Sequence, residues 1–171
     1  LEGNHEGIVD LITLEAHIFK GDNGETIETG PVPDELKEVC ETQRGKLLEA
    51  LADLDDEIAE LYLEGEEVPL PKIYAALRAA TIARKITPVC LGSAYKNKAV
   101  QPVLDAVLHF LPSPMDRTYK ALDPKDESIV HELACDPDKP LVMLAFKLED
   151  GQYGQLTYCR VYRGTLNKGD F

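Results

Sequence analysis

The sequence predicts a protein of the α/β class built from three consecutive parts, and three observations support this prediction. Residues 1–83 begin with short apolar runs and continue with apolar residues at three- and four-residue steps, which indicates a small sheet followed by helices. Residues 84–115 contain an apolar strand, a loop and an amphipathic helix, which together are half of an α/β unit. Residues 139–171 have the alternation that is typical of β-strands.

The composition is that of a soluble globular protein. The chain has 171 residues, of which 44% are hydrophobic and 29% charged. No apolar run approaches the roughly 20 residues that cross a bilayer, so we expect no contact with a membrane. The chain begins at Leu1 rather than Met and lacks the basic start of a secretory signal, so we expect it to be a piece of a longer protein.

Cysteine and histidine are too dispersed to indicate a metal site. The four cysteines form no Cys-x-x-Cys pair, and the four histidines are equally scattered. Zinc ligands usually come in close pairs, so the sequence predicts no metal ligands. Reduced thiols in a cytosolic type of compartment are the expectation.

The first part is expected to fold as a sheet followed by three helices. Apolar runs at 8–14 and 17–19 predict strands, and the turn signal at 21–24 leads into a hairpin partner at 26–29. Asp34 is expected to cap the first helix. The cluster at 53–56 divides this helix from a second one. The second helix is expected to end near Glu64-Gly65, and a third to begin at Pro71.

Acidic residues are concentrated in the helical region. Between Asp34 and Glu67 there are 13 acidic and 3 basic residues, so this segment carries −10 of the net charge of −13. Such a surface repels a phosphate backbone, and we expect no direct contact of segment 34–67 with nucleic acid. Two interpretations remain open, a solvated helical face or a docking face for a basic protein surface.

The second part predicts a ligand-binding edge. Residues 86–91 are expected to form a buried parallel strand, because nearly all are apolar. The loop 92–98 and the helix that follows, ending before Pro112, complete the unit. Ligands of α/β sheets bind at the carboxyl ends of strands, where this loop would lie.

The loop itself has the chemistry to meet a carbonyl group. Gly92 allows a sharp turn, Ser93 offers a hydroxyl, and Ala94 leaves room for a close approach. Backbone N–H groups here could donate to a purine carbonyl oxygen, although ordinary turn chemistry explains the same residues. Asn97-Lys98 is not the guanine-reading Asn-Lys-x-Asp signature, because Val100 stands in the fourth position and cannot accept a hydrogen bond.

The sequence contains no motif for phosphate binding or covalent catalysis. There is no Gly-x-x-x-x-Gly-Lys-Ser/Thr phosphate loop, no Gly-x-Ser-x-Gly and no Gly-rich dinucleotide loop. We therefore assign no catalytic residue to this chain.

The third part begins with a polar stretch. Residues 116–138 are rich in turn formers and predict a linker, with a short strand at 129–130. Strands are then expected at 141–148 and 156–163, joined by a tight turn at 151–154.

Several separated segments, taken together in their order and spacing, closely resemble the elongation factor G family of translational GTPases. These segments are residues 61–67, 86–101, 104–107, 111–114, 145–147 and 160–164. The resemblance covers nearly the whole chain, and agreement across separated segments is far more specific than any one of them.

The resemblance implies an assignment for each part. Residues 1–83 correspond to a subdomain inserted into the GTPase domain, and 84–115 to the last strand, the guanine loop and the last helix of that P-loop-type domain. Residues 116–138 are then the linker, and 139–171 the first strands of a β-barrel domain.

The resemblance also implies a partial nucleotide site. The family's loop at Ser93, Ala94, Tyr95 and Lys96 closes over the guanine, with backbone N–H groups of Ala94 or its neighbours facing the base oxygen. Tyr95 replaces a usual Leu, and Ala99 a usual Gly. The intact parent would use GTP and Mg²⁺ and promote movement of tRNA and mRNA on the ribosome. This chain is expected to bind neither and to be inactive, since the phosphate loop, switch regions and catalytic residues of the family would precede Leu1.

Partners and location follow by the same resemblance. The inserted subdomain of the family meets the ribosomal stalk protein, and segment 34–67 is the expected contact. The expected location is the bacterial cytoplasm, with the mitochondrial matrix as an alternative. Two other functions stay open: a fragment of a ribosome-protection or release-factor GTPase, and a non-enzymatic acidic module that binds proteins.

Overall fold

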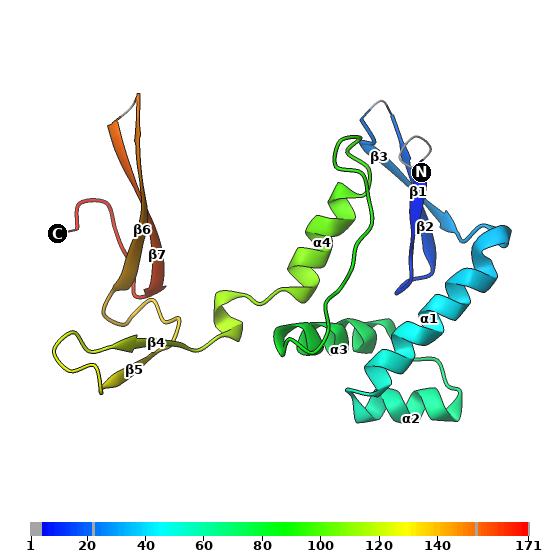
Figure 1. The fold of residues 1–171 in the computed structure, drawn as a ribbon, viewed down its shortest axis with the longest axis horizontal. Coiled ribbons are helices and arrows are strands. Elements are labelled where there is room, and N and C mark those ends of the chain that lie inside the picture. Colours follow the sequence, from blue (N-terminus) through cyan, green and yellow to red (C-terminus); the bar gives the residue numbers. More distant parts are fainter. Residues whose placement is uncertain (1–4, 22, 153, 171) are drawn as a thin grey trace. The chain divides into compact units, whose positions relative to one another are not determined.

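The computed structural model divides the chain into two compact units, Leu1–Leu111 and Pro112–Phe171 (Figure 1). The structure describes residues 5–21, 23–152 and 154–170. The features predicted at the first four residues, at Asp22, at Tyr153 and at Phe171 lie outside this range.

A three-stranded antiparallel sheet opens the first unit. Its strands are β1 (Gly7–Asp10), β2 (Glu15–Lys20) and β3 (Thr26–Pro31), in the order β1-β2-β3. The predicted hairpin between the second and third strands is confirmed. The first apolar run is a strand only as far as Asp10, whose carboxylate accepts a hydrogen bond from the backbone N–H of Ile12 at 2.7 Å and so begins a turn.

The helices α1 (Lys37–Ala52), α2 (Asp56–Glu64) and α3 (Leu70–Ile82) follow. The predicted break between α1 and α2 is confirmed. Asp55 caps α2 by accepting a hydrogen bond from the N–H of Ile58 at 3.1 Å, and Gly65 ends the helix with a left-handed backbone (φ 72°).

The predicted cap at Asp34 is wrong. A short 3-10 turn, η2 (Asp34–Leu36), precedes α1, and Asp34 is its first residue. The carboxylate of Asp34 pairs with the Lys37 ammonium at 2.6 Å instead of accepting from a backbone N–H. The nearby lysine, one turn along, offers the carboxylate a charged partner and so competes with the backbone.

The core of the first unit lies among its helices. Leu51, Ile58 and Ile73 are almost fully buried, and Phe110 from the last helix packs with them. The sheet is joined to α1 by Arg44, whose guanidinium donates to the carbonyl oxygens of Leu11 (2.7 Å) and Ile12. These contacts hold the turn between β1 and β2 on the helical part.

The predicted parallel strand at 86–91 is wrong. The segment is extended but forms no strand, and within the described part of the chain no strand pairs with it. Val89 and Leu91 are 82% and 72% exposed. Apolar composition alone does not make a strand, because a strand requires a hydrogen-bonding neighbour, and among the described residues the segment has none.

Helix α4 (Val100–Phe110) completes the first unit as predicted. Arg78 on α3 donates through Nη1 to the carbonyl oxygens of His109 and Leu111, both at 3.0 Å. The His109 carbonyl belongs to the last turn of α4 and the Leu111 carbonyl directly follows the helix, so neither has an intrahelical donor. Arg78 therefore fixes the end of α4 on α3.

The described residues of the second unit form a 3-10 turn and two hairpins. The elements are η3 (Pro114–Asp116), β4 (Tyr119–Leu122), β5 (Val130–Leu133), β6 (Val142–Gly151) and β7 (Gly154–Arg163). The hairpin β6–β7 is confirmed, and β4–β5 is an added hairpin within the range predicted as a linker. The guanidinium of Arg160 on β7 joins the two hairpins by donating to the hydroxyl of Tyr119 at 2.8 Å.

Candidate functional site

The loop 92–98 is a closed turn held by backbone hydrogen bonds. The N–H of Ser93 donates to the carbonyl of Lys98, and the N–H of Lys98 donates back to Ser93, both at 2.9 Å. The N–H of Asn97 donates to the carbonyl of Ala94 at 3.1 Å and forms the tip. The two arms of the loop are therefore fixed to each other without the help of side chains.

The base of the loop is narrow. A Cβ atom added to Gly92 would lie 2.7 Å from the carbonyl oxygen of Lys98, so the two arms approach more closely than any side chain allows. Ala99 follows with φ 63° and is 1% exposed. The left-handed backbone of Ala99 turns the chain from the loop into α4.

The tip of the loop carries the predicted site residues. Ser93 and Lys96 are half-buried, Ala94 is exposed, and Tyr95 is fully exposed at 100%. The Ser93 N–H is already engaged in closing the loop. In the described part of the chain no acceptor faces the N–H groups of Ala94 and Tyr95, so these two are the donors available for a carbonyl oxygen.

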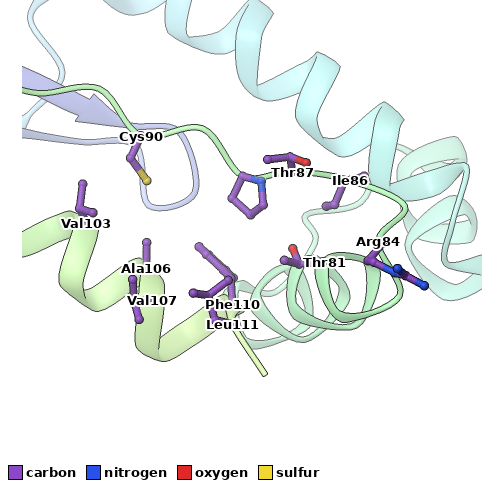
Figure 2. A pocket seen from close by; sticks show the side chains of 11 residues that line it. Thr81, Arg84, Ile86, Thr87, Cys90, Val103, Ala106, Val107, Phe110 and Leu111 are labelled. Atoms are coloured by element: carbon purple, nitrogen blue, oxygen red, sulfur yellow. The ribbon is translucent and has the colours of Figure 1, made fainter. Parts of the chain in front are cut away.

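A cavity of about 460 Å³ lies below the extended segment 86–90 (Figure 2). Its walls are the end of α3, that segment and one face of α4, and they are mostly apolar. The lining residues are Thr81, Arg84, Ile86, Thr87, Pro88, Cys90, Val103, Ala106, Val107, Phe110 and Leu111. Such a lining suits the packing of apolar side chains rather than the binding of phosphate groups.

The acidic residues of segment 34–67 lie mainly on the surface of α1 and α2. Asp55 is the half-buried exception because it caps α2. Glu57 forms an ion pair with Lys72 of α3. Glu60 and Glu64 are exposed and one helical turn apart, so they share a face of α2.

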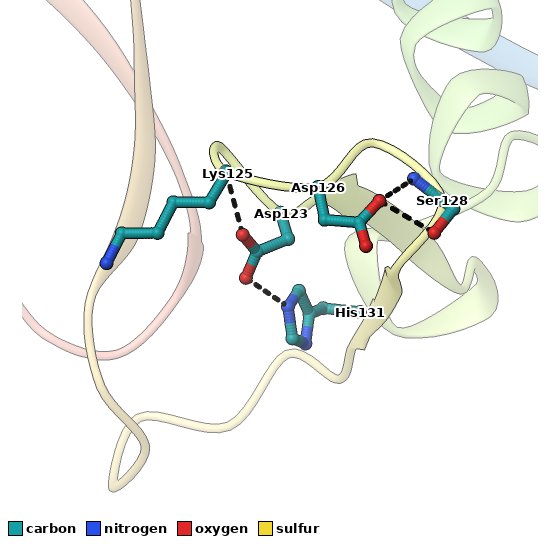
Figure 3. Close-up of polar contacts among 5 residues, drawn as sticks. All are labelled: Asp123, Lys125, Asp126, Ser128 and His131. Atoms are coloured by element: carbon teal, nitrogen blue, oxygen red, sulfur yellow. Dashed lines mark hydrogen bonds and ion pairs between the residues drawn. The ribbon is translucent and has the colours of Figure 1, made fainter.

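A polar network closes the loop of the β4–β5 hairpin (Figure 3). The carboxylate of Asp123 accepts from the N–H of Lys125 at 2.8 Å and contacts the His131 ring at 3.2 Å. These two contacts, the Lys125 amide first, lower the pKa of Asp123 below its ordinary value. Asp126 accepts hydrogen bonds from the hydroxyl and then from the N–H of Ser128, and these bonds, the hydroxyl above all, also lower the pKa of Asp126.

Tyr74 is a further perturbed group, in the first unit. Burial raises the pKa of its hydroxyl, and the carboxylates of Asp10, Glu15 and Asp105 raise it further. The ring stacks on Phe110 with centroids 5.9 Å apart. Tyr74 is therefore a packing residue between α3 and α4.

Metal clusters and membrane-spanning helices are both absent from the described residues. No group of three or more His, Cys, Asp or Glu side chains among them is placed to hold a metal ion. None of their helices combines the length and apolar character needed to cross a membrane.

The chain is similar to one segment of several bacterial and organellar proteins. It is 52% identical over 169 residues to "Elongation factor G 1" of Borreliella afzelii and 48% identical to "Elongation factor G" of Rhodopirellula baltica, covering 99% of this chain and 24% of each relative. It is 46% identical to "Elongation factor G-1, mitochondrial" of Arabidopsis thaliana, covering all of this chain and 23% of that protein. No protein-family model matches the chain.

A solved structure shares the fold. A crystal structure of a protein from Thermus thermophilus matches with a TM-score of 0.72 and 29% identity, over 96% of this chain and 22% of that one. The predicted α/β class is thereby confirmed.

In these comparisons the chain matches one segment of a longer protein. It is homologous, along almost its whole length, to part of elongation factor G, and it spans about a quarter of the length of the relatives it matches.

Proposed function

We propose that this chain is the part of an elongation-factor-G-type GTPase that covers the guanine base and presents an acidic docking surface to the ribosome. The observation that carries the proposal is the similarity to about one quarter of elongation factor G, at 52% and 50% identity to two relatives over 99% of this chain. The closed loop 92–98 supports it, because the loop presents backbone donors at an exposed tip.

The loop would read the base through its backbone. In the proposed site the N–H groups of Ala94 and Tyr95 donate to the guanine carbonyl oxygen, while Ser93 and Lys98 keep the loop closed. A base without that oxygen would leave the donors unpaired, which disfavours its binding. Tyr95, fully exposed, would pack beside the base.

The remaining chemistry belongs to other parts of the factor. GTP binding requires a cradle for the phosphates, and Mg²⁺, when bound, neutralises charge on the β- and γ-phosphates. The loop 92–98 contains no carboxylate and so does not fit Mg²⁺. We therefore place the phosphates, the metal and catalysis outside this chain.

The acidic face of α1 and α2 is the proposed contact with the ribosomal stalk protein. Charge complementarity would speed docking to a basic patch and would select against nucleic acid. The intact factor would promote movement of tRNA and mRNA on the ribosome. It would act in the bacterial cytoplasm or, as the name of the Arabidopsis relative suggests, in the mitochondrial matrix.

Isothermal titration of this chain with GDP tests the proposal. We expect no binding tighter than roughly millimolar, because the chain holds only the base-contacting rim of the site. Micromolar affinity would show a complete pocket and overturn the proposal. The full-length factor, titrated under the same conditions, is the positive control.

A further inference from the structure

We propose that the inserted sheet positions the guanine loop, and that Gly24 and Lys98 are the positioning residues. The inference rests on the proposed function of the loop 92–98. It goes beyond that function because it assigns a role in nucleotide affinity to a part of the chain that does not touch the nucleotide.

The first contact is made by the turn between β2 and β3, which lies beside the loop (Figure 1). A Cβ atom added to Gly24 would lie 2.9 Å from the Asn97 carbonyl oxygen, 3.1 Å from the Lys98 Cγ and 3.2 Å from the Lys96 carbonyl oxygen. All three atoms belong to the returning arm of the loop. Gly24 is itself buried, so its backbone packs directly on that arm.

The second contact is made by the side chain of Lys98. Its ammonium donates to the carbonyl oxygen of His5 at 2.6 Å, just before β1 begins. The two residues are 93 positions apart. A charged donor at this distance forms one of the stronger hydrogen bonds. Lys98, which has no role in a guanine signature, thus ties the loop to the sheet.

Both contacts fall on residues 96–98, on the returning arm, and leave the N–H groups of Ala94 and Tyr95 available. The hydrogen bonds between Ser93 and Lys98 transmit the position of the returning arm to the outgoing arm. Ala99, buried at the start of α4, fixes the other end of the arm. The tip is therefore pre-organised at a defined place, which reduces the ordering cost of binding the base.

The sheet is connected in turn to the acidic part of the subdomain. Arg44 on α1 donates to the carbonyl oxygens of Leu11 and Ile12 in the turn after β1. A continuous series of contacts thus joins α1, the sheet and the guanine loop. A displacement of the sheet would move the donors away from the base.

Nucleotide affinity of the full-length factor is the test, with fluorescent GDP as the probe. Gly24→Ala and Lys98→Met are each expected to weaken GDP binding about three- to tenfold, the range expected for one lost hydrogen bond or a comparable misfit. KM for GTP should rise by the same factor while kcat at saturating GTP stays unchanged. Lys98→Arg, which keeps a charged donor, should restore most of the affinity.

Two matched variants control for strain and charge. Gly21 has a left-handed backbone (φ 86°), like Gly24, and lies in the same turn. The Cβ atom of Gly21→Ala, however, would meet the flexible Glu25 carboxylate rather than the loop 92–98. Lys20→Met removes an ammonium from β2 that pairs with Glu28 at 4.0 Å. Both variants should bind GDP like the parent.

Ala94→Tyr at the tip separates the two hypotheses. If Ala94→Tyr weakens GDP binding but Gly24→Ala and Lys98→Met do not, the positioning role is wrong and the proposed site stands. If Ala94→Tyr also leaves affinity unchanged, the loop is not part of the site and both proposals are overturned.

Nuclear magnetic resonance of this chain provides a readout that does not depend on nucleotide. Both positioning variants should shift the amide signals of residues 93–98 while those of α2 and α3 stay in place. Unchanged loop signals would contradict the inference, and collapse of the whole spectrum for one variant would leave the other to decide.

Discussion

Ala99 occupies a backbone conformation that suits glycine. Its φ of 63° is left-handed, and its methyl group is almost fully buried between the loop and α4. An L-residue in this region costs roughly 1–2 kcal/mol, which the burial of the methyl group partly offsets at about 0.8 kcal/mol. The family that the sequence resembles usually has Gly at the position of Ala99.

Substitutions at Ala99 should therefore separate strain from packing. Ala99→Gly is expected to change the free energy of unfolding by less than about 1 kcal/mol, because relief of strain and loss of burial oppose each other. Ala99→Val should cost about 2–4 kcal/mol, since a β-branched residue is strained here and has no room. Urea unfolding followed by helical circular dichroism reports on the first unit, which holds α1 to α4. Equal losses in both variants would show that the backbone is not strained.

Asp123 gives the hairpin loop of the second unit a dependence on pH. Its pKa is lowered from the ordinary 3.8, mainly by the N–H of Lys125 and then by His131. Because the pKa of this carboxyl is lower in the folded protein than in the unfolded one, its stabilising effect is complete at a pH above the unfolded-state pKa. The effect is lost as the pH falls through the folded-state pKa. The loop 123–129 should therefore stay ordered at pH 5 and loosen only in acid, below about pH 4.

The amide signals of Lys125 and Ser128 measure this transition. Both should titrate with midpoints below 3.8, because the pKa of Asp126 is lowered as well. Asp123→Asn should abolish the pH titration of the Lys125 amide signal and preserve the titration of the Ser128 amide signal. A midpoint of Lys125 at or above the ordinary value would mean that the carboxylate is not engaged in solution.

At the scale of single elements, the exposed acidic face of α2 is where the proposed docking to the stalk protein is best tested. Glu57 is engaged with Lys72, so reversing its charge would also disturb the packing of α2 on α3. Glu60 and Glu64 are exposed on one face and offer the cleaner test.

The double reversal Glu60→Lys with Glu64→Lys should slow ribosome-stimulated GTP hydrolysis by the full-length factor. We expect a decrease of about three- to tenfold at low salt, shrinking as ionic strength rises, with unchanged GDP affinity. Glu127→Lys with Glu132→Lys makes the same change of charge in the second unit and should have no effect. An unaltered rate in the α2 variant would favour the solvated-face interpretation.

Local signals in the sequence were sufficient for some elements and insufficient for others. The acidic cluster at 53–56 and Glu64-Gly65 correctly delimit α2, because capping and a left-handed end depend on residues within one turn. Asp34 misleads because a nearby lysine competes for its carboxylate. The extended segment 86–91 misleads because pairing depends on a partner strand rather than on composition.

In the candidate site, too, local sequence signals predict some features and miss others. The sharp turn and the exposed tip of the loop follow from the small residues at 92–94. The contacts of Gly24 and Lys98 join residues that are far apart in the chain, so no local pattern predicts them. Asn97-Lys98 was correctly set aside as a guanine signature, yet its lysine has a structural role that only the fold reveals.

At the scale of the whole molecule, several large apolar side chains of the first unit are exposed among the described residues. Val89 and Leu91 on the extended segment face solvent, and on α4 Leu104 and Leu108 are 59% and 77% exposed. Exposed apolar surfaces of this kind commonly mark interaction sites. Under the proposed function, the rest of the GTPase domain covers them in the full-length factor.

Because this apolar surface is exposed here and covered in the proposed full-length factor, the same substitution should change the stability of the two proteins differently. In the 171-residue chain, Val89→Asn and Leu108→Gln should each change the free energy of unfolding by less than about 0.5 kcal/mol, because both side chains are exposed. In the full-length factor each should cost about 2–4 kcal/mol, since the change would remove buried apolar contacts and bury an unpaired amide. Leu63→Gln on α2, where the side chain is 83% exposed, is the matched control and should be neutral for stability in both. Thermal unfolding of the six variants and their two unsubstituted parents measures the difference, and equal effects in the short chain and the full-length factor would place α4 on the outside of the intact factor.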